Sequence, residues 1–174
     1  MFKRVLLLLW RQWLVWRGAR LAASARVNPS VSVVPAALQL GEHARLYWGG
    51  EVLTHGAGRL VLGAHSHIAP HFYCLIGGNR LQIGARVAIG PRCMLFCHSN
   101  AIPADVTATA FVDCHTDGDI RIGNNVFIGA GVIVLPGAVI GDNVVVAAGS
   151  VVKGELAPGG LYAGQPARKV KALC

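Results

Sequence analysis

A strict six-residue spacing of aliphatic side chains runs through the second half of this 174-residue sequence. From Ile122 to Val152 an aliphatic residue stands at every sixth position, often with glycine directly after it. A period of six fits neither an α-helix nor an alternating strand, and it is typical of a short strand followed by a tight turn. Three such units form one coil of a triangular prism, with the aliphatic side chains stacked inside.

The same register can be followed back to Leu40 with three interruptions. Four extra residues follow Ala57, three follow Asn79 and 21 follow Asn100, in each case after a third hexapeptide. Insertions at one position of the coil should all leave the prism at the same corner. We therefore predict five coils and a less regular sixth before them, at residues 40–57, 62–79, 83–100, 122–139, 140–157 and 27–39.

The net charge of +8, from 16 Lys and Arg against 8 Asp and Glu, is concentrated at the two ends. Residues 1–26 carry six basic side chains and no acid, and residues 168–171 carry three more. The 141 residues between them carry seven basic and eight acidic side chains, a net charge of −1. Because a nucleic-acid-binding face needs basic residues spread along one surface, we expect no nucleic-acid partner.

The N-terminal segment, MFKRVLLLLWRQWLVWRGARLAAS, predicts an amphipathic helix. Its longest apolar run, Val5 to Trp10, is too short to span a bilayer or to act as a secretory signal. One helical stripe is apolar and rich in tryptophan: Leu6, Leu9, Trp10, Trp13 and Trp16. Tryptophan beside arginine favours a membrane–water interface, while packing on protein explains the stripe equally well. Both interpretations stay open. In the first, residues 1–20 would make the contact with an anionic membrane.

Composition and cysteine usage indicate a cytoplasmic protein. The five cysteines are odd in number and irregular in spacing, which does not match a disulfide framework. If the N-terminal helix binds lipid, the protein would lie peripherally on the inner face of the membrane. We divide the chain into an amphipathic basic helix at 1–26, a β-helix at 27–160 with a loop insertion at 101–121, and a C-terminal tail at 161–174.

The run from Ile122 to Val170, IGNNVFIGAGVIVLPGAVIGDNVVVAAGSVVKGELAPGGLYAGQPARKV, resembles the hexapeptide-repeat acyltransferases. It is similar in particular to the sugar and exopolysaccharide O-acetyltransferase branch, which includes galactoside and maltose acetyltransferases. The resemblance implies an all-β solenoid, a left-handed parallel β-helix with a short C-terminal tail. It also implies a homotrimer with active sites between subunits, acetyl-CoA as acyl donor without a metal, and a small-molecule or glycan acceptor.

A histidine beside the long insertion is the best candidate for the general base. His98 stands at the entry of the 21-residue loop and matches the catalytic histidine that the resemblance implies, and His115 at the other end of the loop is the second choice. A neutral imidazole can take the proton of an acceptor hydroxyl as its oxygen attacks the thioester, in a direct transfer without an acyl-enzyme. Four carboxylates in or near the loop are open as its orienting partner: Asp105, Asp113, Asp117 and Asp119.

The resemblance also implies where CoA binds. It points to backbone groups of the last two coils, to two polar side chains near them, and to basic residues of the tail for the nucleotide phosphates. In this order the candidates are Gly129, Ala130, Ala148 and Gly149, then Ser150 and Lys153, then Arg168 and Lys169.

Two other functions fit parts of the sequence. The seven histidines admit a metal enzyme on the same fold, like the γ-class carbonic anhydrases, which takes three histidines from neighbouring coils. Adjacent residues of a strand face opposite ways, however, so the pairs Cys97–His98 and Cys114–His115 are poorly placed to give two ligands each. The second alternative is a non-enzymatic, membrane-associated scaffold, for which the long loop has no obvious purpose.

Overall fold

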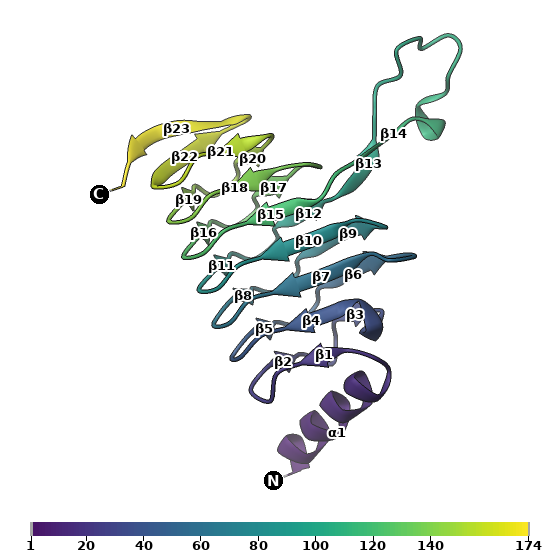
Figure 1. Cartoon of the computed structure of the whole chain (residues 1–174), viewed down its shortest axis with the longest axis vertical. Coiled ribbons are helices and arrows are strands. Elements are labelled where there is room, and N and C mark those ends of the chain that lie inside the picture. The colour runs from purple at the N-terminus through teal and green to yellow at the C-terminus, as the bar shows by residue number, and fades with distance from the viewer. Residues whose placement is uncertain (1, 174) are drawn as a thin grey trace.

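Figure 1 shows the computed structural model of this chain, a prism of stacked coils with one helix at its N-terminal end. The structure describes residues 2–173, with side chains from Leu6 to Leu173. Each full coil contributes one short strand to each of three sheets, called here sheets A, B and C. The predicted all-β solenoid, a left-handed parallel β-helix of hexapeptide coils, is confirmed.

The strands follow one another around the prism in the order A, B, C. Sheet A contains β1 (Arg20–Leu21), β4 (Leu38–Leu40), β7 (Arg59–Leu62), β10 (Arg80–Ile83), β15 (Ile120–Ile122), β18 (Val139–Ile140) and β21 (Glu155–Leu156). Sheet B contains β2 (Arg26–Val27), β5 (Arg45–Leu46), β8 (His67–Ile68), β11 (Ala88–Ile89), β16 (Phe127–Ile128), β19 (Val145–Val146), β22 (Gly160–Gly164) and β23 (Ala167–Ala172). Sheet C contains β3 (Ser32–Val33), β6 (Glu51–Thr54), β9 (Tyr73–Gly77), β12 (Met94–Phe96), β17 (Ile133–Val134) and β20 (Val151–Val152).

The residues of the six-residue period form ladders inside the prism. In sheet A, for example, Leu62 pairs with Leu40 on one side and with Ile83 on the other. Equivalent ladders run through sheets B and C, and the side chains of all three are buried in one continuous core. Burial of a large aliphatic side chain stabilises a fold by roughly 1.5–3 kcal/mol, so this repeated stack is the main source of stability.

All three predicted insertions fall where sheet C gives way to sheet A. The two short ones lengthen strands of sheet A, since residues 58–61 lie largely in β7 and residues 80–82 lie in β10, whereas the longest leaves the prism between β12 and β15. A short 3-10 helix, Pro35–Ala37, occupies the same corner of the first coil. The longest insertion contains an antiparallel pair, β13 (His98–Asn100) and β14 (His115–Asp117), with a 3-10 turn at Phe111–Asp113.

The predicted boundary between helix and β-helix, at residue 26, is too late. Helix α1 covers Phe2–Trp16, and the first coil already begins with β1 at Arg20. The cause is Gly18, which adopts φ +98°; its N–H donates to the Val15 carbonyl and that of Ala19 to the Leu14 carbonyl. This pair of hydrogen bonds around a left-handed glycine is the Schellman motif that ends helices. The part of the prediction that concerns Met1 lies outside the described residues.

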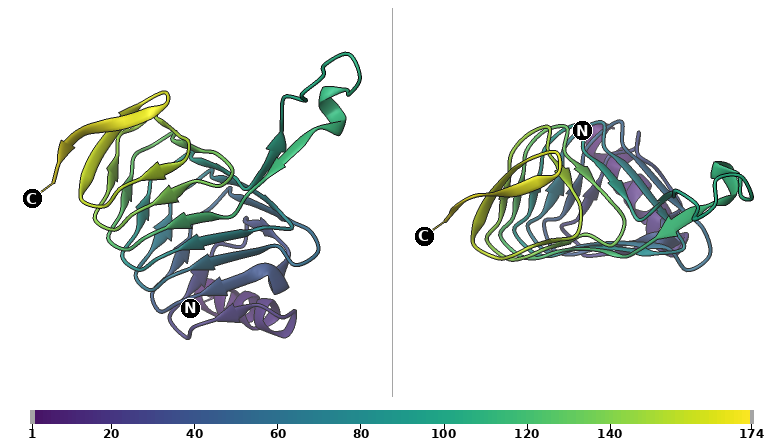
Figure 2. Two further views of the ribbon diagram at one scale, coloured as in Figure 1. Left: turned by 45° about the horizontal axis from the view of Figure 1, so that its top comes forward. Right: turned by 90° about the horizontal axis from the view of Figure 1, so that it is seen from above.

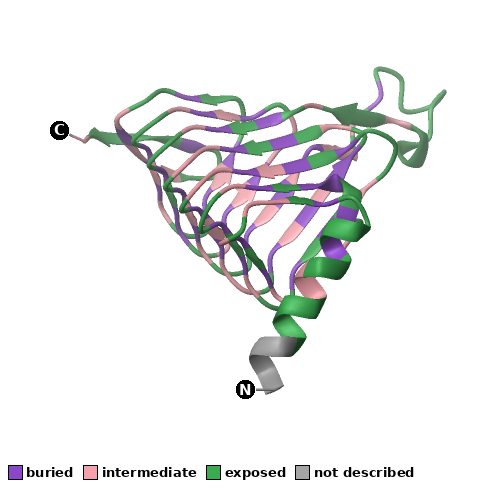
Figure 3. Ribbon diagram, turned by 60° about the horizontal axis from the view of Figure 1, so that its bottom comes forward, coloured by how far each residue is buried: buried purple, intermediate pink, exposed green. Residues whose placement is uncertain are grey.

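Helix α1 closes the N-terminal end of the prism (Figure 3). Leu14 is fully buried against the first coil, and the Trp10 indole N–H donates to the Val27 carbonyl at 3.1 Å. The Arg11 guanidinium donates to the carbonyls of Leu21 and Ala22, each at 3.2 Å. The helix therefore covers the open end of the hydrophobic core, and its buried face differs from the stripe expected from the sequence.

The predicted C-terminal tail continues the fold as a hairpin. Strand β22 extends sheet B in parallel with β19, and β23 turns back antiparallel to β22. Tyr162 takes the place of the aliphatic residue in the sheet B ladder, opposite Val146. Residues 160–172 thus cap the C-terminal end of the prism; Cys174 lies outside the described residues.

Candidate active site

The long insertion is an arm that projects away from the prism at the corner between sheets C and A (Figures 1 and 2). Strands β13 and β14 form its base, with His98 opposite Asp117 and Asn100 opposite His115. Backbone hydrogen bonds link Ala101 to Cys114 at 2.8 Å and Gly118 to Cys97 at 2.9 Å. The arm therefore begins at His98, three residues before the loop predicted at 101–121, and the chain has returned to sheet A by Ile120.

His98 is held by a carboxylate at the base of this arm. Its Nδ1 lies 3.0 Å from Oδ1 of Asp117, and the same oxygen accepts a hydrogen bond from the side-chain amide of Asn79 at 2.7 Å. Asn79 is fixed in turn, because its amide also donates to the carbonyls of Ile76 and Cys97. The amide of Asn79, followed by His98, lowers the pKa of the Asp117 carboxyl, which is therefore ionised at neutral pH.

This geometry determines which ring nitrogen of His98 can act as a base. An ionised carboxylate only accepts hydrogen bonds, so Nδ1 of His98 carries the proton and donates it to Asp117. The lone pair of the neutral imidazole is then on Nε2. His98 is only partly buried, and Nε2 can accept a proton from a bound hydroxyl.

The structure selects Asp117 from the four candidate partners. Asp105 lies at the tip of the arm, where hydrogen bonds from Thr107 lower its pKa. Asp113 ends the 3-10 turn. Asp119 accepts the backbone N–H of Arg80 at 2.8 Å. These three carboxylates have local structural roles, whereas Asp117 meets His98 directly.

Two further histidines lie beside His98. The rings of His98 and His115, the first and second choices from the sequence, are 5.0 Å apart between centroids. On the other side is Gly77, with φ +62°, where an added Cβ would lie 3.2 Å from Cβ of His98 and 3.4 Å from Nε2 of His55. The absence of a side chain at Gly77 therefore lets His55 approach the site. Sequence reasoning missed both Asn79 and His55, which come from the coils below the arm.

Cys97 is separated from this site although it precedes His98 directly. Its side chain points into the core, where its thiol approaches the Arg80 carbonyl at 3.8 Å. Burial raises the pKa of the Cys97 thiol to about 12, so it remains protonated at neutral pH. Cys97 is accordingly no candidate for a thiolate nucleophile.

Four of the predicted CoA contacts gather at another corner, between sheets B and C. Gly129 and Ala130 follow β16, and Ala148 and Gly149 follow β19 one coil further on. The two turns stack, because the N–H of Gly149 donates to the carbonyl of Ala130 at 2.9 Å. The turn of the C-terminal hairpin reaches the same corner, where the Gln165 amide donates to the Gly149 carbonyl at 2.7 Å.

The remaining predicted CoA contacts are placed differently. Arg168 and Lys169 are exposed on β23, just after the turn that meets Gly149. Lys153 is exposed at the corner between sheets C and A, away from the other candidates. Ser150 is buried, and its hydroxyl accepts the N–H of Gly164 at 3.2 Å. Ser150 therefore contacts the hairpin turn from inside the fold.

Between residues 2 and 173, no group of three or more His, Cys, Asp or Glu side chains is placed to hold a metal ion. None of the described helices is long and apolar enough to cross a membrane.

The repeats have recognisable relatives. Residues 119–154 match the family of the bacterial transferase hexapeptide (six repeats), and this confirms the resemblance inferred from the repeat pattern. The chain is 31% identical over 116 residues to the galactoside O-acetyltransferase of Escherichia coli K12. That match covers 64% of this chain and 56% of the relative, so the chain spans little more than half of the relative's length.

Solved structures share the fold along almost the whole chain. A mutant of the N-acyltransferase AntD from Bacillus cereus, in complex with dTDP and coenzyme A, matches with a TM-score of 0.80 at 24% identity, over 94% of this chain and 90% of that one. A hexapeptide-repeat acetyltransferase from Vibrio cholerae, in complex with acetyl-CoA, matches with a TM-score of 0.65 at 24% identity, over 95% and 76%.

Proposed function

We propose that this chain, which carries the hexapeptide repeats of bacterial transferases, is an acetyl-CoA-dependent O-acetyltransferase. The acceptor is a hydroxyl of a saccharide or glycan precursor. The observation that carries this proposal is the His98–Asp117 pair at the base of the arm, with Nδ1 tied to a carboxylate and Nε2 left to accept a proton. The sequence similarity to a galactoside O-acetyltransferase supports the reaction class.

In this mechanism His98 is the general base. Acetyl-CoA, when bound, supplies the acetyl group as a thioester. His98 accepts the proton of the acceptor hydroxyl through Nε2 while that oxygen forms a bond to the thioester carbonyl carbon, and the carbon–sulfur bond breaks. Asp117 stabilises the imidazolium that forms, as a carboxylate does in other histidine-based sites. The proton then passes from Nε2 to the departing CoA thiolate, which restores the neutral imidazole.

We place CoA along the corner formed by Gly129, Ala130, Ala148 and Gly149. Small residues there leave the backbone open to a long, thin cofactor arm. Arg168 and Lys169, beyond the hairpin turn, suit the nucleotide phosphates because guanidinium and ammonium groups form charge-assisted hydrogen bonds with phosphate. The acceptor can be identified with a panel of saccharides incubated with acetyl-CoA, in which mass spectrometry detects a gain of one acetyl group.

Two features support a homotrimer with active sites between adjacent subunits. Within one chain, the proposed CoA corner lies where the strands of sheet C begin, and His98 lies where they end. A thioester held at the CoA corner of one subunit would therefore meet the His98 of a neighbouring subunit. The arm also exposes apolar side chains, among them Ile102 at 84% and Val112 at 70% of full exposure. Surfaces of this kind are typical of contacts between proteins.

The double change Ile102→Ser and Val112→Ser tests this assembly. We expect the variant to elute as a monomer in size-exclusion chromatography with light scattering, and to lose acetyl transfer together with the trimer. Val34→Ser is the matched control, because Val34 is exposed on the first coil far from the arm. A variant that remains trimeric and fully active, or a wild type that is active as a monomer, would refute the arm's proposed role.

We further propose that the free face of α1 rests on an anionic membrane, which would place the protein at the inner face of the cytoplasmic membrane. Of the predicted stripe, only Trp10 packs inward. Leu6, Leu9, Trp13 and Trp16 remain exposed, Trp16 at 79%. The Arg17 guanidinium lies 5.5 Å from the centre of the Trp13 ring. The first 41 residues contain no acid, so this end of the molecule is complementary to anionic lipid.

The double change Trp13→Ser and Trp16→Ser tests this contact without disturbing Leu14, whereas deletion of residues 2–20 would also remove part of the first coil. In co-sedimentation with phosphatidylcholine–phosphatidylglycerol vesicles, we expect at least about a tenfold loss of binding. Trp48→Ser, at the remaining tryptophan, which is exposed on the second coil, should bind like wild type. Equal binding by wild type and double variant would contradict the proposal, and so would a wild type that binds neither anionic nor neutral vesicles.

A further inference from the structure

Two histidines occupy backbone positions that usually suit asparagine or glycine. At the corner between sheets A and B, His43 and His65 adopt φ +56° and +59°. In the later coils the equivalent residues are Asn125 and Asn143, with φ +53° and +56° and a hydrogen bond between their side chains. Arg86 shares this left-handed conformation with φ +57°, so the conformation belongs to this corner of the repeat. The two imidazoles stack with centroids 4.8 Å apart.

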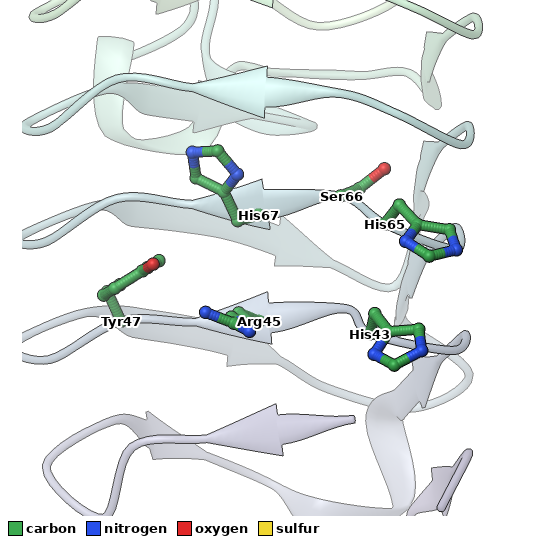
Figure 4. Close-up of a pocket in the computed structure, with 6 residues that line it drawn as sticks. All are labelled: His43, Arg45, Tyr47, His65, Ser66 and His67. Carbon is green, nitrogen blue, oxygen red and sulfur yellow. The ribbon is translucent and has the colours of Figure 1, made fainter. Parts of the chain in front are cut away.

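These imidazoles form one wall of a pocket on the outer face of sheet B (Figure 4). The pocket has a volume of about 320 Å³ and is lined by His43, Arg45, Tyr47, His65, Ser66 and His67. Figure 4 shows the two corner imidazoles one above the other, with Arg45 and His67 beside them on adjacent strands. Ser66 is buried and its hydroxyl is already used, since it donates to the Gly84 carbonyl and accepts the Val87 N–H.

The charge of the pocket favours an anion. Arg45 lies in register between Arg26 and His67 on neighbouring strands, and Arg86 follows His65 at the next turn of the corner. Glu42, which precedes His43, is the acidic residue next to these cations in the sequence. Among the described side chains, no ion pair joins its carboxylate to Arg45 or to the histidines of the pocket. Burial, followed by the positive charge of Arg45, lowers the pKa of His67.

The geometry points to a binding site for a phosphate group at this pocket, in which Arg45 and the imidazoles of His43, His65 and His67 donate hydrogen bonds to the phosphate oxygens. A planar guanidinium matches two phosphate oxygens at once, and each imidazole adds one directional donor. The pocket lies on sheet B, away from the corner that carries His98 (Figure 1), so this inference does not depend on the proposed transferase activity. The phosphate can belong to a soluble phosphate ester or to a phospholipid headgroup, since the pocket adjoins the groove under α1 through His43 and Arg45.

Titration calorimetry with inorganic pyrophosphate on the full chain tests the site. The double variant Arg45→Gln and His65→Asn should bind at least about tenfold more weakly than wild type, because it loses charge-assisted hydrogen bonds. Asparagine at position 65 preserves the corner, as Asn125 and Asn143 show. Arg59→Gln is the matched control, because Arg59 is an exposed cation on β7 of sheet A. It should bind like wild type.

Vesicle co-sedimentation of the same variants distinguishes the two sources of phosphate. If the double variant Arg45→Gln and His65→Asn loses pyrophosphate binding but still binds phosphatidylglycerol vesicles, the ligand is a soluble phosphate ester. If the double variant loses binding to both, the ligand is a phospholipid headgroup. Pyrophosphate affinity should also rise as pH falls from 8 to 6, because a bound anion favours protonated imidazoles. No pyrophosphate binding by wild type, or equal loss in the Arg59→Gln control, would overturn the assignment.

Discussion

Replacing His98 by alanine is expected to lower kcat for acetyl transfer by roughly 10²–10⁴-fold. The reason is that, among the described histidines, His98 is the one whose ring is oriented by a carboxylate. A saccharide hydroxyl is a poor nucleophile unless its proton is removed as the bond to carbon forms. The affinity for acetyl-CoA should stay at the wild-type value, because His98 lies at a different corner from the proposed CoA contacts. A continuous assay of released CoA thiol, together with calorimetry of acetyl-CoA binding, measures both quantities.

Two matched variants make this result specific. His71→Asn removes a histidine from a left-handed corner position remote from the arm, with φ +60°, and should leave kcat unchanged. His115→Ala separates the first and second choices for the base, because the His115 ring lies 5.0 Å from that of His98 but has no carboxylate partner among the described residues. If His115→Ala abolished turnover while His98→Ala retained it, the base would be His115.

Replacing Asp117 by asparagine is expected to lower kcat by about a hundredfold, with little change in KM. With its Oδ1 in the place of the carboxylate oxygen, asparagine can still accept hydrogen bonds from His98 and Asn79, but it provides no charge to stabilise the imidazolium. The hydrogen bond from Asn79 can persist in the variant, so the arm should remain folded. Glu155→Gln, the loss of one exposed carboxylate on β21, is the matched control.

The pH dependence distinguishes a positioning role of Asp117 from a purely structural one. The lowered pKa of Asp117 keeps the carboxylate ionised as the solution is acidified, so its negative charge is present on the acid side of neutrality. Asparagine removes this charge, which stabilises positive charge in the site. In Asp117→Asn the acid limb of kcat/KM should therefore move to lower pH while the plateau falls. An unshifted limb with a lowered melting temperature would mean that Asp117 only holds the arm in place.

The prism itself could be predicted from the sequence because its core is periodic. A side chain such as Ile83 must match Leu62 below and Ile122 above, and this requirement repeats every six residues along the chain. The insertions were predictable for the same reason, since each interrupts the six-residue register after a third hexapeptide. The N-terminal boundary was missed because Gly18 ends α1 through its backbone conformation, and the basic, apolar composition continues past it.

The partners of His98 could be predicted only in part. Its place beside the arm followed from the spacing of the repeats, but Asp117 meets it through the antiparallel register of β13 and β14, which no periodicity records. Asn79 reaches the same carboxylate from 38 residues away in the sequence. Ser150 and Lys153 are near neighbours in sequence, but strand β20 lies between them, with Ser150 at one of its ends and Lys153 at the other.

The measurement that tests the central claim most directly is the stoichiometry of CoA release against acetylated product for the wild-type protein. Direct transfer with His98 as base predicts that free CoA thiol appears only when a saccharide acceptor is present, with one acetylated hydroxyl for each thiol and no acetylated protein by intact-mass spectrometry. Thiol released without an acceptor together with acetyl-protein would contradict direct transfer. A protein that neither binds acetyl-CoA nor releases thiol with any acceptor would contradict the transferase itself and favour a scaffold.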